Sequence, residues 1–581
     1  MKIPVKMEAR EKVQSLLWMS WILAVVLGGK LAAAEPDLGT TLERYQADRA
    51  SLRHRYRDPR QPGVHERFDE FYREQLAALQ ALPFDQLSRA GQIDYLLLRS
   101  HLEFMREELA NAAERDAAAA VFLPDFLPLR EILLQHERDH TLDGPTTAEQ
   151  FAATAVTIAD LVKKLNEMPA AADRPLPERI SGLRAAEEVA SLKRSVGNLH
   201  SFYQSYDPNY SWWCAQPQQK LQEALNSLET TLRNRIVGVP ADDKETIIGQ
   251  PIGEAALRVA LDHAWIPYSP EELIAIGERE LAWCDEQMVA ATQALGLGDD
   301  WRKGLDYVAR QYVPPGQQPQ LIHDLAQESI DFLEARDLVT IPPLAKEVWR
   351  MEMMSPERQR VNPYFLGGDT IIVSYPTAEM SQEEKLTSLR GNNPHFARAT
   401  VHHELIPGHH LQGFMTDRYR PERQIFRTPF WIEGWALYWE LRLWEKDFAR
   451  NAADQIGMLF WRRHRAARIV FSLNYESGRW TPEQCVQLLV ERAGHEPGNA
   501  RAEVRRSVMA GYGPLYQAAY LLGGLQLRAL HRELVEAGKM TERQYHDAVL
   551  QRGPIPIELL RLELTDAPLT PDMTTSWRFD D

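Results

Sequence analysis

Residues 399–412 read ATVHHELIPGHHLQ, and this short stretch decides how the rest of the chain is interpreted. Four of the 17 histidines fall within nine residues here, and Glu404 stands among them. Burying several imidazoles is costly unless their nitrogens have partners, and neutral imidazole is a common ligand of zinc. The pattern therefore indicates a metal centre.

The spacing of the histidines leaves the second ligand open. His403-Glu404 resembles the start of the H-E-x-x-H helix of zinc peptidases, in which two histidines one turn apart bind zinc. The position four after His403 is Pro407, which cannot bind a metal and interrupts a helix. On an ideal helix, a residue six positions on lies about 120° from His403 and one seven positions on about 20°. Helical geometry thus favours His410, whereas a widened turn would bring His409 round.

Residues 431–440, WIEGWALYWE, contain two carboxylates in an aromatic segment that we expect to be a buried helix. Glu433 and Glu440 are seven residues apart and therefore share one helical face. A buried carboxylate needs a partner. We interpret Glu433 as a metal ligand and Glu440 as a carboxylate that orients a ligand histidine. The alternative is an ion pair with Arg427 or Arg442.

The fold class is predicted to be mainly α. Apolar side chains recur at helical spacing over residues 93–109. Capping boxes that begin at Ser269, Thr481 and Thr541 mark three helix starts in the second half of the chain. β-branched residues near 346–375 predict a small β-ribbon, which forms either a plain hairpin or an edge for an extended peptide.

Composition excludes several classes of protein. The chain has 581 residues, with 66 Lys+Arg against 82 Asp+Glu and a formal charge of -16. An acidic chain is a poor partner for nucleic acid or an anionic membrane. Three cysteines are too few for a disulfide scaffold. The chain is thus expected to bind neither nucleic acid nor an anionic membrane.

Residues 1–34 are predicted to be a signal peptide, because a basic start, a short apolar run and Ala-Ala-Ala precede Glu35. The apolar run is about half the length that crosses a bilayer, although a short membrane anchor is the alternative. We expect export to the periplasm or beyond, with no stable membrane anchor after cleavage. Residues 35–245 are predicted to be an N-terminal helical region and 246–581 the metal-bearing region, joined in one continuous fold.

Two motifs together suggest a family. H-E-x-x-P-G-H-H-x-Q at 403–412 and E-G-W-A-L-Y-x-E at 433–440 resemble the bacterial domain-of-unknown-function family 885, which is grouped with the gluzincin metallopeptidases. The resemblance implies a large helical body that encloses a cleft. The chain is more distantly similar to thimet-type oligopeptidases and angiotensin-converting enzyme, and aligning their zinc-helix Gly-His with Gly408-His409 makes His409 the second ligand.

The resemblance also implies a function, namely hydrolysis of peptide bonds in short peptides. It implies Zn²⁺ bound by His403, His409 and Glu433, with Glu404 as the general base on a bound water. An amidase of non-peptide bonds, or an inactive protein that binds metal or peptide, are the alternatives.

A late segment offers tyrosines at 512, 516 and 520, which share one helical face. Tyr520, three residues before Gly523, matches the catalytic tyrosine of the family, whereas an aromatic core stripe is the other interpretation. Ser472 and Glu476 depart from the Asp and His that the family tends to carry, which raises the question of activity. His395 is a further candidate for substrate contact, although a lone histidine is more often structural.

Overall fold

The computed structural model describes residues 37–580, apart from 62, 140, 244, 360–366, 369 and 566. The predicted signal peptide lies outside the described residues. Within the described part of the chain, no helix is both long and apolar enough to cross a membrane. The chain is mainly α-helical, as predicted, with two short strands.

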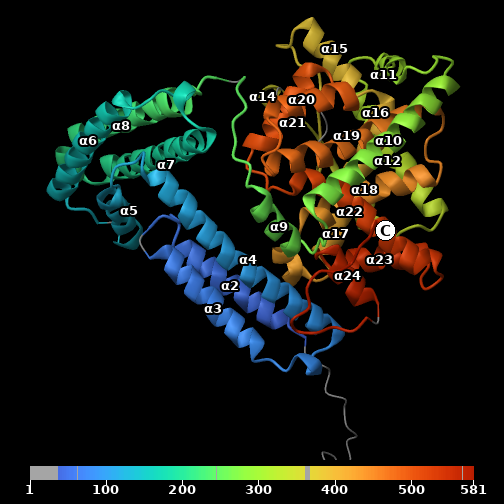
Figure 1. The fold of residues 1–581 in the computed structure, drawn as a ribbon, viewed down its shortest axis with the longest axis horizontal. Coiled ribbons are helices and arrows are strands. Elements are labelled where there is room, and N and C mark those ends of the chain that lie inside the picture. Colours follow the sequence, from blue (N-terminus) through green and yellow to red (C-terminus); the bar gives the residue numbers. More distant parts are fainter. Residues whose placement is uncertain are drawn as a thin grey trace, which may run out of the picture.

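The first part of the chain forms two helical groups, which Figure 1 shows on the left. The first group is a bundle of α2 (Gly39–Arg55), α3 (Val64–Gln80) and α4 (Arg89–Ala120), with the short η1 (Phe84–Gln86) between α3 and α4. The second group contains α5 (Leu127–Asp139), α6 (Gly144–Glu167), η2 (Ala171–Asp173), α7 (Leu176–Tyr206), α8 (Pro208–Thr231) and η3 (Leu232–Val237). Helices α6 and α8 pack closely against each other, and α7 packs on α8.

The remaining helices form the larger part on the right of Figure 1. They begin with α9 (Glu254–His263), α10 (Pro270–Ala294), α11 (Trp301–Ala309), α12 (Gln318–Ala335), α13 (Pro343–Val348), α14 (Pro356–Gln359), α15 (Gln382–Gly391), α16 (Pro394–Glu404) and α17 (His409–Thr416). They continue with η4 (Pro421–Phe426), α18 (Pro429–Glu445), α19 (Ala452–Glu476), α20 (Pro482–Leu488), η5 (Leu489–Ala493), α21 (Pro497–Met509), α22 (Tyr516–His531), η6 (Arg532–Glu536), α23 (Glu542–Gln551) and α24 (Ile557–Leu564).

The hydrophobic cores do not follow the predicted boundary between the two helical regions near residue 245. Helices α2–α4 share one continuous core with the C-terminal helices, to which Ile93 and Trp435 both belong. Helices α5–α8 enclose a core of their own around Phe151 and Leu221. The second helical group is therefore the part of the described chain that packs most independently.

The predicted small β element is present, but its strands run in parallel. β1 (Arg350–Met353) pairs with β2 (Thr370–Val373), with Arg350 opposite Thr370 and Met353 opposite Val373. A hairpin is antiparallel, so the hairpin interpretation is wrong. Strand pairing depends on where the chain returns, which the local composition of a strand does not reveal.

Local capping chemistry predicted helix starts correctly. Ser269, Thr481 and Thr541 each accept a hydrogen bond from the backbone three residues on, and Glu272, Gln484 and Gln544 complete the capping boxes. The apolar face at 93–109 lies within α4, where Ile93, Leu96 and Leu97 are buried. The three cysteines are buried and unpaired.

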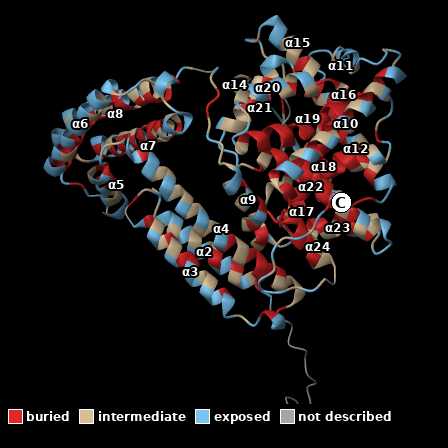
Figure 2. Cartoon of the chain, viewed as in Figure 1, coloured by how far each residue is buried: buried red, intermediate tan, exposed pale blue. Residues whose placement is uncertain are grey.

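A close contact between α18 and α22 organises the centre of the larger part, where Figure 2 shows the buried residues concentrated. A Cβ atom on Gly434 would lie 2.7 Å from the Cα of Gly523, and one on Gly523 would lie 2.1 Å from the carbonyl oxygen of Phe430. Only glycine permits such an approach of two helices. This contact brings Glu433, next to Gly434, close to the start of α22.

Candidate metal centre

The histidine-rich stretch folds as two helices joined by a tight turn. Helix α16 ends at Glu404 and α17 begins at His409. The amide of Gly408 donates to the carbonyl oxygen of His402, 3.0 Å away. A Cβ atom on Gly408 would lie 1.8 Å from the carbonyl oxygen of His403, so no other residue fits. The indole nitrogen of Trp435 donates to the carbonyl oxygen of Pro407 at 2.7 Å and ties the turn to α18.

His403 is buried and held by a carboxylate of α18. Its Nδ1 lies 2.7 Å from Oε1 of Glu440, and its Nε2 lies 3.8 Å from Oε2 of Glu433. Burial disfavours the charged ring, but the hydrogen bonds to Glu433 and Glu440 outweigh burial and raise the pKa of His403 to about 9. A hydrogen bond from Nδ1 to a carboxylate leaves Nε2 available as a metal ligand.

His409 reaches the same carboxylate from α17. Its Nε2 lies 3.1 Å from Oε2 of Glu433, and its Nδ1 lies 3.4 Å from Oε1 of Gln412. The Gln412 amide is anchored in turn by a bond from its nitrogen to the carbonyl oxygen of Trp431, at 3.0 Å. Burial opposes ionisation of Glu433, but His409 and His403 hold the pKa of this carboxyl well below its usual range. Two imidazoles thus converge on one carboxylate oxygen.

Glu404 lies beside these groups at the end of α16. One ligand-type atom from each of His403, Glu404 and His409 lies within 4.8 Å of the other two. Burial raises the pKa of Glu404 above its usual value, although His403 and His409 oppose that shift. A carboxyl with a raised pKa accepts and returns a proton more readily at neutral pH.

The other histidines of the stretch face away from this group. Nε2 of His410 lies 2.8 Å from the carbonyl oxygen of Ala345. His402 is fully buried, and burial lowers its pKa to about 3. Of these two histidines, His409 approaches Glu433, whereas His410 points to the backbone of α13. The turn at Pro407-Gly408 re-aims the chain in a way that ideal helix geometry does not anticipate.

Tyrosines of α22 complete the polar side of the group. The hydroxyl of Tyr516 donates to Oε1 of Glu433 at 2.6 Å, and the hydroxyl of Tyr520 donates to that of Tyr516 at 3.2 Å. Burial raises the pKa of Tyr520 to about 12, so the phenol keeps its proton. Tyr520 also lies face to face with His403, with ring centres 6.3 Å apart. Tyr516 has the direct bond to Glu433, and Tyr520 stands behind it.

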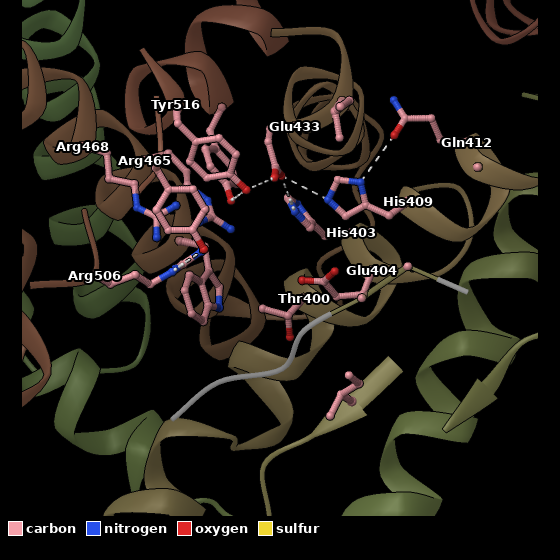
Figure 3. Close-up of a pocket in the computed structure, with 18 of the residues that line it drawn as sticks. Thr400, His403, Glu404, His409, Gln412, Glu433, Arg465, Arg468, Arg506 and Tyr516 are labelled. Carbon is pink, nitrogen blue, oxygen red and sulfur yellow. Dashed lines mark hydrogen bonds and ion pairs between the residues drawn. The ribbon is translucent and has the colours of Figure 1, made fainter. Parts of the chain in front are cut away.

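These side chains line a cavity of about 590 Å³, part of which Figure 3 shows. His403, Glu404, His409 and Glu433 meet on one side, and Arg465, Arg468 and Arg506 lie together on another. The arginines come from α19 and α21. The sequence signal for those of α19 was residues 461–468, WRRHRAAR. Arginines are seldom buried without a partner, so several of them in a helix rich in apolar residues indicate a functional or paired site. Sequence reasoning assigned no role in the site to these arginines or to Gln412, although Gln412 ends the motif at 403–412.

Several other candidate residues lie outside the group around Glu433. His395 is buried at the start of α16, where its Nδ1 lies 2.8 Å from Oδ1 of Asp454. Ser472 and Glu476 lie on α19 outside the residues that line the cavity. Arg442 pairs with Glu445 and Glu542 rather than with the glutamates of the centre.

The geometry defines a class of protein: a helical body with a buried His/Glu centre that opens into a cavity. Residues 36–564 match the family described as "Bacterial protein of unknown function (DUF885)", and the chain belongs to this family. A search of curated proteins gave no match.

Two solved structures share the fold. The first is described as "a putative lipoprotein of unknown function from Shewanella oneidensis", with a TM-score of 0.68 and 15% identity over 90% of this chain and 98% of that one. The second is described as "the putative lipoprotein from Colwellia psychrerythraea", with a TM-score of 0.58 and 17% identity over 91% of this chain and 97% of that one.

Proposed function

We propose that the protein is a zinc-dependent peptidase of the gluzincin type that hydrolyses short peptides. The observation that carries the proposal is the convergence of His403 Nε2 and His409 Nε2 on Oε2 of Glu433, at 3.8 and 3.1 Å, with Glu404 alongside. Two imidazoles and a carboxylate, with one further carboxylate as base, are the groups that such a reaction requires.

The donor set fits zinc. Both histidines have their Nδ1 engaged, one by Glu440 and the other by Gln412, so that each Nε2 can act as a ligand. His403, His409 and Glu433 would hold the ion. When bound, zinc supplies Lewis acidity that activates a water and polarises a carbonyl group. Binding would displace the proton that the raised pKa keeps on His403 in the free protein.

Glu404 takes the proton of the attacking water and returns it to the leaving amine. Its buried position and raised pKa suit both transfers. The hydroxyl oxygen of the water becomes part of the new carboxyl group, and its two protons end on the products. No oxidation or reduction is involved.

Tyr516 donates directly to the carboxylate of Glu433, and Tyr520 donates to the hydroxyl of Tyr516. Both keep their protons at neutral pH, because burial raises their pKa values. A phenol beside the centre can donate a hydrogen bond to the oxygen on which negative charge develops. Tyr520 stays the family-based choice for this role, and replacing each tyrosine by phenylalanine separately would identify the donor.

Export of the protein is part of the proposal. The basic, apolar and small-residue pattern of residues 1–34 supports it, and both solved structures are described as those of putative lipoproteins. Substrates would then be peptides of the periplasm or the cell exterior.

The first test measures metal. The full mature chain is dialysed with zinc and its bound metal is counted, alongside His409→Ala, His410→Ala and His323→Ala variants. We expect one zinc per chain, lost in His409→Ala and kept in His323→Ala, whose side chain is 61% exposed on α12. Zinc lost in His410→Ala but kept in His409→Ala would contradict the assignment.

The second test measures cleavage of a mixed peptide library by mass spectrometry. Glu404→Gln should retain zinc and lose kcat/KM by about 10²–10⁴-fold, the usual contribution of a general base. Stoichiometric zinc without cleavage of any peptide would contradict the peptidase proposal and leave an amidase or a binding protein. Full activity in Glu404→Gln would contradict the mechanism.

A further inference from the structure

Arg465 is a buried cation without a closely bound anion among the described residues. Its residue is 7% exposed and lines the cavity, and within the described part of the chain its Nε has no hydrogen-bond partner. The nearest carboxylate, Oε1 of Glu440, lies 4.0 Å from Nη2 and is already bound by His403 at 2.7 Å. A buried guanidinium is costly unless an anion with good hydrogen bonds accompanies it.

Two more arginines add to this charge. Arg468 is buried, and its Nε and Nη2 both contact Oε1 of Glu503, at 2.7 and 2.6 Å. Its Nη1 is buried and has no hydrogen-bond partner among the described residues. Nη1 of Arg506 lies 3.6 Å from Oε2 of the same glutamate. Three guanidinium groups thus have two carboxylates close by, Glu440 and Glu503, and Glu440 is already bound by His403, in a chain whose formal charge is -16.

The tyrosines of the centre hold these cations in place. The Cζ atoms of Arg465 and Arg468 lie 4.5 and 4.8 Å from the ring centre of Tyr520, and that of Arg506 lies 5.2 Å from the ring of Tyr512. Such cation–π contacts are favourable when the groups are desolvated. The side of the cavity formed by Arg465, Arg468 and Arg506 therefore adjoins the candidate metal centre, as Figure 3 shows.

We propose that Arg465, supported by Arg468 and Arg506, binds a carboxylate of the peptide substrate. This inference rests on the proposed peptidase function and names its substrate class. Arginine binds carboxylates through two parallel hydrogen bonds, and Arg465 and Arg468 both line the cavity with hydrogen-bonding capacity that the described residues leave unused.

The position of Arg465 limits where the peptide is cut. Arg465 and His403 both approach Oε1 of Glu440. The guanidinium thus lies within the length of about two extended residues, ~3.4 Å each, from the His403 ring. Because Nδ1 lies on the side of the ring away from Nε2, a carboxylate bound there stands within a few residues of the bond that is cleaved. The enzyme would release short C-terminal fragments, or would cut beside an acidic side chain.

The test uses three sets of N-acetylated peptides that differ only in their carboxylates. The first set has free C-termini and no acidic side chain, the second has amidated C-termini and no acidic side chain, and the third is amidated with one internal glutamate. We expect the first or third set to be cleaved with a kcat/KM at least tenfold above the second. Preference for the first set identifies the C-terminus as the source, and preference for the third identifies an acidic side chain.

Failures of the two proposals can be told apart. If the wild-type protein cleaves all three sets equally, the carboxylate inference is wrong and the peptidase function stands. If the zinc-loaded protein cleaves none of them, the peptidase function is wrong, and the inference about its substrate falls with it.

Variants then locate the site. Arg465→Gln should reduce the preference for the charged set at least tenfold, mainly through KM. The control is Arg310→Gln, which should leave the preference unchanged, because Arg310 is an exposed residue at the end of α11 and does not line the cavity. Direct binding of the same peptides to the Glu404→Gln protein gives a second readout that does not need turnover. If Arg465→Gln folds, contains zinc and keeps the same substrate preference as wild type, the assignment is wrong. If Arg465→Gln does not fold, equal binding of peptides with and without a carboxylate to the Glu404→Gln protein would overturn the assignment instead.

Discussion

At the scale of single residues, the proposed role of Glu440 is to orient the ligand His403 without binding the metal itself. It accepts a hydrogen bond from Nδ1 of His403 at 2.7 Å, and His403 and Arg465 keep its pKa below the usual value despite burial. Carboxylates in this position fix the ring and increase its basicity, and their loss typically weakens metal binding 10–100-fold.

Glu440→Gln should therefore raise the dissociation constant for zinc about 10–100-fold, measured by competition with a chelator. Glu445→Gln, on the same helix, is the matched control, because Glu445 pairs with Arg442 and Arg528. Equal zinc affinity of wild type and Glu440→Gln would show that the His403 ring is held by other contacts.

Glu476 makes stability depend on pH. Burial raises its pKa from 4.5 to about 7, while the backbone amide of Ile252 opposes the shift. Between these values the unfolded chain loses its proton and the folded chain keeps it, so the free energy of unfolding falls as pH rises. Glu476→Gln removes this dependence.

We expect Glu476→Gln to be about 1–3 kcal/mol more stable than wild type at pH 8, from a shift of this size. At pH 4.5 the two proteins should be nearly equal. Denaturant unfolding at both values measures the difference, and a variant that is less stable at pH 8 would contradict the expectation. Glu476 does not line the cavity, so peptide cleavage should persist.

At the scale of elements, the contact between α18 and α22 determines how closely the two helices that carry Glu433 and Tyr516 approach each other. Gly523→Ala places a methyl group 2.1 Å from the carbonyl oxygen of Phe430. The helices must move apart, and we expect a loss of about 1–3 kcal/mol or more together with weaker zinc binding. Gly498→Ala on α21 has open space and should be neutral or slightly stabilising. Unchanged stability and zinc affinity in Gly523→Ala would contradict the role of the contact.

How far the sequence predicts these elements depends on how local their causes are. Capping boxes such as that of Ser269 use side chains three residues apart, so they were found correctly. The parallel pairing of β1 with β2 depends on the path of the chain between them, and the hairpin interpretation failed. Sequence motifs named His409, Glu433 and Glu440. They did not name Arg465 as a cavity residue, because its position there depends on packing against Tyr520 of α22.

At the scale of the whole molecule, the two cores should respond differently to metal. The centre lies among α16, α17 and α18, which belong to the larger part, whereas α5–α8 have their own core. A ligand that binds only the folded state stabilises it by about 2.7 kcal/mol when present at 100 times its dissociation constant.

Zinc should therefore slow amide hydrogen exchange in α16–α18 and α22 and leave α6–α8 unchanged. Comparing the zinc-loaded protein with the chelated protein by mass spectrometry measures this directly. The His409→Ala protein, treated in the same way, should show no difference on adding zinc. Equal protection of α6–α8 would mean that the two cores unfold as one unit.

The glycine contact between α18 and α22 has one more consequence. Because the two helices meet backbone to backbone at Gly434 and Gly523, no side chain stands between them at this point to set the spacing of the α18 and α22 backbones. The indoles of Trp431 and Trp439, whose nitrogens have no hydrogen-bond partner among the described residues, are therefore open to exchange for other bulky apolar groups. The two positions without side chains are not, so the smallest residues of the site are the hardest to replace.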